Sequence, residues 1–229
     1  MVSYDVISFF TNIPVSETIE HILNVIPDNK IFISKPVLKE LLHLACRNIV
    51  FKFNKEIYLQ TEGMCMGSNL GPTMAAFAMN IIESKLTTQP LAYKRYVDDI
   101  FAIFASKEEA DDFFEKLNSP HSELKFTQEN ETNESLIFLD VNVIKVNGKI
   151  ETKWHRKNTN TGIYLNKTAC SPMNYKTASI RSLIFRAFKI CSTTKLFNDC
   201  FNEIMSIFIL NGFNLKFIKK IRDQVISKL

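Results

Sequence analysis

The spacing of hydrophobic and polar positions predicts a mixed α and β fold in the first part of the chain. Residues 2–13 are rich in β-branched and aromatic side chains, which is typical of a strand. Residues 15–23 are expected to form a helix with Ser16 as its N-cap. Apolar residues recur at helical spacing over residues 34–50, and residues 51–60 alternate as in a hairpin.

Two adjacent carboxylates interrupt an apolar stretch farther along the chain. A loop rich in Gly and Met, residues 61–72, precedes a helix predicted over residues 73–86. Residues 93–104 then have strand composition on both sides of Asp98 and Asp99. This pattern predicts a strand, a turn and a second strand, with both acids at the turn, where they can leave the core and face a cleft.

The second half of the chain turns from strands to helices. Residues 106–119 predict an acidic helix capped by Ser106. Residues 123–156 indicate a run of short strands with turns between them. Two or three amphipathic helices end the chain, and they include residues 179–191 and 214–229.

Composition indicates a globular protein. The chain has 229 residues, 46% of them hydrophobic, which allows a sizeable core in one or two domains. No apolar run reaches the ~18 residues that a membrane-spanning helix needs, and the N-terminus lacks a secretory signal pattern. We therefore expect an intracellular protein with no membrane partner. The five cysteines form no Cys-x-x-Cys pair, which favours free thiols, and the four histidines show no metal-ligand spacing.

Charge divides the chain into two parts. Residues 1–152 hold 14 Lys and Arg against 21 Asp and Glu, whereas residues 153–229 hold 14 against 3. The second part therefore suits a polyanionic partner. A solvated helical face that happens to be basic is the alternative interpretation.

The acidic pair has a clear chemical use. Crowded carboxylates can be held ionised by divalent cations, and two Mg²⁺ ions about 4 Å apart can activate a 3′-hydroxyl and stabilise a leaving pyrophosphate. Such a site needs a further carboxylate on a neighbouring strand, and Asp5 lies inside a second apolar strand. A single Asp in a strand is more often a turn or capping residue, and an Asp-Asp pair is more often on the surface.

Four motifs together resemble those of reverse transcriptases. "YDVISFFTNIP", "GMCMGSNLGPTMAA", "RYVDD" and "FLDV" are similar in order and rough spacing to motifs A, B and C and the later palm motifs. These motif sequences are most similar to those of the reverse transcriptases of Penelope-like retroelements, which are relatives of telomerase. The resemblance covers residues 3 to about 195.

The resemblance implies an α+β fold. Residues 1–152 would form a polymerase palm with motifs A to E, in which helices pack on one face of an antiparallel sheet. Residues 153–229 would form an all-α, basic, thumb-like region. The fingers region that precedes motif A in the family would be absent from this chain.

The family's metal-binding roles would fall on four residues. Asp5 and Asp98 would be the carboxylate ligands of two Mg²⁺ ions, with Mn²⁺ as a possible substitute. The backbone carbonyl of Val6 would assist, and Asp99 would be the neighbouring acid of the pair. The resemblance thus implies catalytic roles for Asp5, Asp98 and Asp99.

The resemblance also implies nucleotide and nucleic-acid contacts. Phe10 would be the aromatic steric gate that excludes a ribose 2′-hydroxyl, although plain core packing is the alternative. The nucleotide side of the site would be lined by Gly63, Met66, Gly67 and Ser68. The primer and template would be contacted by Tyr96, Phe138, Leu139, Arg181, Arg186 and Lys189.

The function implied is RNA-directed DNA polymerisation. The partners would be an RNA template, a DNA primer and dNTPs, and a nuclear location would follow from the retroelement resemblance. A remnant of such an element that binds nucleic acid without catalytic activity is the alternative. A metal-dependent nuclease is disfavoured, because no His or Lys that could activate water stands beside the acids.

Overall fold

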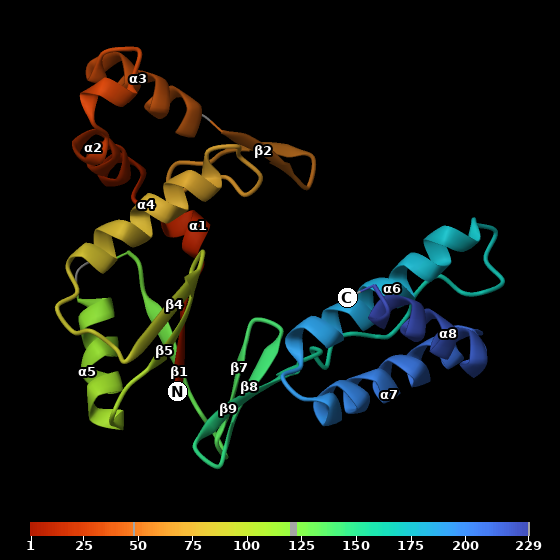
Figure 1. The fold of residues 1–229 in the computed structure, drawn as a ribbon. Coiled ribbons are helices and arrows are strands. Elements are labelled where there is room, and N and C mark those ends of the chain that lie inside the picture. The colour runs from red at the N-terminus through yellow and green to blue at the C-terminus, as the bar shows by residue number, and fades with distance from the viewer. Residues whose placement is uncertain (48, 120–122, 229) are drawn as a thin grey trace. The chain divides into compact units, whose positions relative to one another are not determined.

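The computed structural model describes residues 1–229 apart from residues 48, 120–122 and 229. The chain forms two compact units, Met1–Asn130 and Glu131–Leu229, and each is described by itself (Figure 1). The sequence prediction divided the chain at 152/153, where the charge changes. The compact units divide earlier, because the strands that follow residue 130 pair with one another and pack on the C-terminal helices.

The first unit is built on a four-stranded antiparallel sheet. Its strands are β1 (Val2–Val6), β4 (Ala92–Tyr96), β5 (Asp99–Ile103) and β6 (Phe126–Asn130). Their order is β4-β5-β1-β6, so β1 is a central strand that pairs with β5 on one side and β6 on the other. The N-terminal strand of the chain therefore lies next to a hairpin about ninety residues away in the sequence.

Helices cover one face of this sheet. The helices of this unit are α1 (Phe9–Asn12), α2 (Val15–Val25), α3 (Lys35–Cys46), α4 (Gly71–Ser84) and α5 (Lys107–Asn118), with a 3₁₀ turn at Asp28–Lys30. Side chains of α4 and α5 join those of the sheet in one hydrophobic core. Tyr4 of β1 is buried in this core and its hydroxyl donates to the carbonyl of Ala110, at 3.1 Å. This bond attaches the central strand to α5.

Two predicted boundaries in this unit were wrong. The strand predicted over residues 2–13 ends at Val6, because Ser8 adopts a left-handed conformation (φ 50°) from which α1 begins. The next helix begins at Val15 with Pro14 as its N-cap, not Ser16. The Ser16 hydroxyl instead accepts a hydrogen bond from Arg47, at 2.8 Å.

The other local predictions in this unit were closer. The hairpin predicted over residues 51–60 is confirmed as β2 (Val50–Phe53) and β3 (Glu56–Leu59). The hydroxyl of Ser106 caps α5 by accepting from the backbone N–H of Glu109, as predicted. These elements depend on local turn and capping chemistry, which the sequence displays directly.

The second unit begins with a three-stranded antiparallel meander. Its strands β7 (Ser135–Phe138), β8 (Val141–Val146) and β9 (Lys149–Trp154) pair in sequence order. Two-residue turns connect them, and the second turn ends in Gly148 at φ 76°. This run of short strands agrees with the sequence prediction for residues 123–156.

Three helices complete the second unit around their own core. They are α6 (Met173–Ile190), α7 (Thr194–Leu210) and α8 (Leu215–Ile226), and their buried side chains pack together with Trp154. A short turn joins α7 to α8, with Gly212 at φ 85°. The buried Asn211 side chain holds this turn, because it accepts from the N–H of Tyr164 and donates to the carbonyl of Gly162.

The cysteines agree with a further expectation. All five cysteines are free thiols, as predicted. Among the residues that the structure describes, no helix is both long enough and apolar enough to cross a lipid bilayer. 

Candidate active site

The central strand β1 presents its two faces to different environments. Val2, Tyr4 and Val6 are buried, whereas Ser3 and Asp5 lie on the opposite face and Asp5 is exposed. Successive side chains of a strand point to opposite faces, so burial of the even-numbered residues fixes Asp5 on the face that the helices do not cover.

The hairpin of β4 and β5 carries the acidic pair. Tyr96 pairs with Asp99, so the turn consists of Val97 and Asp98, and Asp99 is the first residue of β5. The prediction that both acids lie in the turn was therefore right for Asp98 and wrong for Asp99. Ile100, next to Asp99, is fully buried, which places Asp99 on the same uncovered face of the sheet as Asp5.

The strand register brings Asp5 to the acidic hairpin. Tyr4 pairs with Ile100, and continuing this antiparallel register by one residue sets Asp5 opposite Asp99. Partial burial raises the pKa of Asp98, and the negative charge of Asp5 raises it further. The carboxylates of Asp5 and Asp98 are therefore close enough to repel each other.

An arginine that the sequence analysis did not assign holds the hairpin in place. The Arg95 guanidinium donates to both carboxylate oxygens of Glu83 on α4, at 2.6 and 3.0 Å, and to the carbonyl of Val97, at 2.9 Å. The hydroxyl of Tyr93 adds a 2.7 Å bond to the same carboxylate. Half-buried, bidentate pairs of this kind are stronger than ordinary surface ion pairs.

The hairpin turn itself is strained. Val97 has a φ of 57°, in the left-handed region that a β-branched residue rarely adopts. Such a conformation costs on the order of 1–3 kcal/mol and persists only where surrounding contacts impose it. The bond from Arg95 to the carbonyl of Val97 is one such contact.

The Gly/Met loop is anchored to the short helix α1. The N–H of Met64 donates to the carbonyl of Phe10 at 2.6 Å, and Gly63 lies so close to Thr11 that a Cβ at this position would be 2.3 Å from the carbonyl oxygen of Thr11. Gly71 makes a second close approach, because a Cβ there would be 3.3 Å from the ring of Phe10. Sequence reasoning left Gly71 out of the site, although the Gly-Pro pair that opens α4 was a usable signal.

The other residues predicted on the nucleotide side lie on the same loop or near it. Phe10 is half-buried and packs against the core. Part of its ring is therefore accessible to a ligand while the rest contributes to packing. Met66 and Gly67 are exposed, and Gly67 has a φ of 92° with open space around it. Ser68 accepts from the N–H of Leu70 at 3.3 Å.

The predicted primer and template residues are divided between the units. Tyr96 is exposed at the end of β4 in the first unit. The other five, Phe138, Leu139, Arg181, Arg186 and Lys189, belong to the second unit. Leu139 occupies the turn after β7 with φ 55°.

Arg186 is occupied by contacts within the second unit. Its guanidinium forms an ion pair with Asp140 and lies 6.0 Å from the centroid of the Trp154 ring. Arg181 donates to an uncharged partner, the side chain of Gln224, at 3.3 Å. Sequence spacing could not show that Arg186 forms an ion pair and Arg181 does not bond to a carboxylate in the described structure, because their partners come from distant segments.

The donor set at the hairpin is that of a hard cation. Asp5 and Asp98 could offer carboxylate oxygens, and Val6 could offer only its backbone carbonyl, because a valine side chain has no donor atom. Within the described part of the chain, no three His, Cys, Asp or Glu side chains are placed to hold a metal ion by themselves. Two carboxylates still fit Mg²⁺, which proteins usually bind through one or two carboxylates together with substrate phosphates.

Comparison with known families decides the assignment of this unit. The family model described as reverse transcriptase (RNA-dependent DNA polymerase) matches residues 1–134, more than half of the chain. The chain belongs to the reverse transcriptase family. The matched region contains the paired strands, the acidic hairpin and the Gly/Met loop. A second model, described as an animal helix-turn-helix domain, matches residues 163–223.

A solved structure has the same fold. The telomerase from Candida albicans, solved in complex with a fragment of telomeric RNA, is similar to 96% of this chain with a TM-score of 0.61 and 13% identity. The chain spans 40% of the length of that telomerase chain. The similarity shows the α+β palm architecture and the helical C-terminal region expected from the sequence. No curated protein sequence matches the chain.

The contacts of Arg95 with Glu83 and Val97, which we call the Arg95 clamp, can be tested by a conservative substitution. Arg95→Lys keeps the charge but loses the bidentate hydrogen bonds to Glu83 and the bond to the carbonyl of Val97. The free energy of unfolding should therefore fall by about 1–3 kcal/mol. Amide hydrogen exchange at residues 96–99 should accelerate. Arg47→Lys, at a single bond to Ser16, is the matched control and should change neither quantity appreciably. Unchanged exchange in the hairpin of the Arg95→Lys protein would contradict the clamp.

Proposed function

We propose that this chain is the reverse transcriptase region of a Penelope-like retroelement and carries out RNA-directed DNA synthesis. The observation that supports this most strongly is the strand register that sets Asp5 opposite Asp99, with the charge of Asp5 acting on the adjacent Asp98, within the segment that matches the family. The similarity of the quoted motifs to Penelope-like enzymes supports the narrower assignment. The partners proposed are an RNA template, a DNA primer and dNTPs, in the nucleus.

The proposed chemistry is nucleotidyl transfer. The 3′-hydroxyl of the primer attacks the α-phosphate of a dNTP, a new phosphodiester bond forms, and pyrophosphate leaves. Asp5 and Asp98 would hold two Mg²⁺ or Mn²⁺ ions, with the carbonyl of Val6 as a further ligand. Bound there, the ions would lower the pKa of the attacking hydroxyl and stabilise charge on the leaving group.

The chain's own residues would position the reactants. The backbone of β1 holds Asp5, and the Arg95 clamp holds the turn that carries Asp98. The loop that includes Gly67 and Ser68 would approach the nucleotide closely, because Gly67 offers no side chain to obstruct it. Fixed placement of this kind accounts for a large share of the rate of bimolecular reactions on enzymes.

A nucleic-acid-binding protein without turnover is the alternative. The helix-turn-helix match over residues 163–223 favours it, because this region is basic and lies outside the reverse transcriptase match. Such a protein would bind a primer–template through phosphate contacts, and its affinity would fall steeply as salt rises. It would incorporate no nucleotide.

Loss of one carboxylate tests the proposed catalysis. Asp98→Asn preserves shape but removes a metal ligand, so incorporation on poly(rA)/oligo(dT) with Mg²⁺ should fall by at least about a hundredfold, as when one group that stabilises transition-state charge is lost. Glu115→Gln, an exposed change on α5, is the control and should be fully active. Equal incorporation by all three proteins would refute the assignment, and salt-sensitive binding without incorporation by the wild type would favour the alternative.

The role of Phe10 can be separated from packing by comparing two substrates. If the ring excludes the ribose 2′-hydroxyl, Phe10→Val should raise the rNTP to dNTP ratio of kcat/KM by roughly tenfold or more, since specificity is a difference in transition-state binding. The kcat/KM for dNTPs should change little. If Phe10 only packs on Gly71, both substrates should lose efficiency together and the melting temperature should fall.

A further inference from the structure

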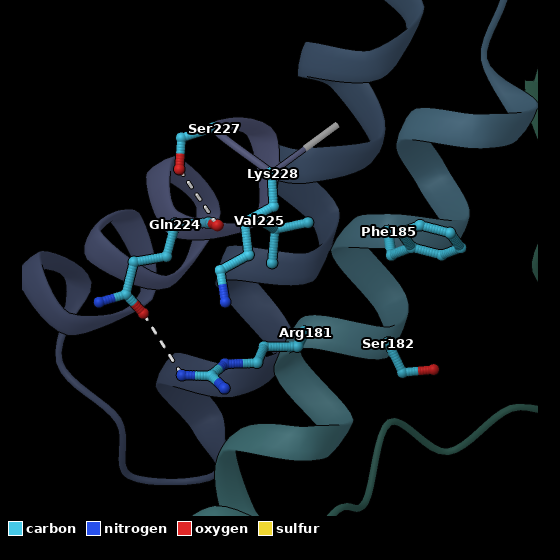
Figure 2. A pocket seen from close by; sticks show the side chains of 7 residues that line it. All are labelled: Arg181, Ser182, Phe185, Gln224, Val225, Ser227 and Lys228. Carbon is cyan, nitrogen blue, oxygen red and sulfur yellow. Dashed lines mark hydrogen bonds between the residues drawn. The ribbon is translucent and has the colours of Figure 1, made fainter.

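A cavity in the second unit lies between α6 and α8, and none of the described residues that line it was assigned to catalysis. Its volume is about 690 Å³, within the usual range for small-molecule sites. It is lined by Arg181, Ser182 and Phe185 of α6, by Gln224 and Val225 of α8, and by Ser227 and Lys228, which follow α8 (Figure 2). We refer to it as the α6–α8 groove.

The lining of the groove combines cations, hydrogen-bonding groups and one aromatic face. Arg181 and Lys228 contribute positive charge, and none of the described residues that line the groove is Asp or Glu. Gln224, Ser182 and Ser227 offer amide and hydroxyl groups, which can bond to the edge of a base. The groove therefore suits a ligand with an anionic part, a polar edge and a flat apolar face.

Phe185 is the flat face, and the core does not require it. On α6 the neighbouring Ile184 and Ala187 fill the core and are fully buried, whereas Phe185 is 45% exposed. The ammonium of Lys189 lies 5.7 Å from the centroid of the Phe185 ring. Arg181, Phe185 and Lys189 are spaced four residues apart, so they form one stripe along the helix.

Positive charge continues from the groove along α8. A second, shallower hollow shares Gln224 and Ser227 with the groove and is lined by Lys216, Lys219 and Lys220. Asp223 also lines this hollow, but its carboxylate is paired with Arg222. A backbone of phosphates leaving the groove would therefore meet further lysines.

We propose that the α6–α8 groove binds an unpaired nucleotide of a single-stranded nucleic acid, with its base stacked on Phe185. Arg181, Lys189 and Lys228 contact the adjacent phosphates. Aromatic platforms among cations are the usual means of binding single strands, because every base has a face to stack. A paired base already stacks on both neighbours and offers Phe185 no face. The inference goes beyond the proposed polymerase, since it needs neither Asp5 nor Asp98.

Fluorescence anisotropy with the full chain tests the stacking. A labelled oligo(dT) is titrated without divalent ions, beside a strand of the same length with abasic residues and beside a blunt DNA duplex. Phe185→Ala should weaken binding of oligo(dT) roughly tenfold or more, the usual effect of losing one stacking aromatic. The same substitution should leave binding of the abasic strand and of the duplex unchanged.

Matched variants separate stacking from folding. Tyr175→Ala removes another exposed aromatic ring of α6 that does not line the groove, and it should bind like the wild type. Phe185→Trp should restore the affinity and should report binding through quenching of the added indole. Arg181→Gln should lower the slope of log affinity against log salt by about 0.7, the value for one phosphate contact to a single strand.

The outcomes distinguish this inference from the proposed function. It is overturned if Phe185→Ala binds oligo(dT) as tightly as the wild type, if the loss is equal on the abasic strand, or if duplex binding falls as much. Glu115→Gln, the control used for incorporation, should retain wild-type binding of oligo(dT). A protein that extends primers but fails the Phe185 test would remain a polymerase without this groove function.

Discussion

The pairing of β1 with β5 is the constraint on which the site depends. Tyr4 and Val6 are buried under the helices, and a slip of one residue along β5 would expose them and bury Asp5. Burial of a large aromatic side chain contributes on the order of 2–3 kcal/mol, so a slip that exposed Tyr4 would cost at least this much and the register is strongly favoured. The position of one catalytic candidate is thus set by the hydrophobic core beneath it, and not by contacts on its own face of the sheet.

Bringing carboxylates together at the hairpin costs electrostatic free energy, and contacts around the hairpin hold them in place despite this cost. Burial and the charge of Asp5 both raise the pKa of Asp98, so its ionisation is less favourable than that of a fully solvated aspartate. Glu83 and Arg95 hold the hairpin against α4 although neither contacts a substrate in the proposed reaction. A strained turn with crowded acids, supported by a half-buried ion pair, would suit the divalent cations proposed above.

Local sequence patterns predicted most helices and strands. They did not predict which side chains from distant segments contact one another. The hairpin at residues 93–104, the cap at Ser106 and the meander after residue 130 follow from strand composition and turn chemistry visible in a few adjacent residues. The end of the first strand did not, because the aromatic pair after Ser8 has strand composition but forms a helical turn. The pairs Arg95–Glu83 and Arg186–Asp140 join separate elements, so spacing alone could not show which arginines are occupied.

The central claim is that Asp5 and Asp98 act on the same cation. Mn²⁺ binding by electron paramagnetic resonance, in the presence of a non-hydrolysable dNTP analogue, tests it in the wild type, Asp5→Asn, Asp98→Asn and the double variant. Each single change should weaken Mn²⁺ binding by about tenfold or more, and the double variant should bind no more weakly than the weaker single variant, because residues that share one ligand are not additive. Losses that simply add, or an Asp5→Asn protein with wild-type affinity, would contradict the account.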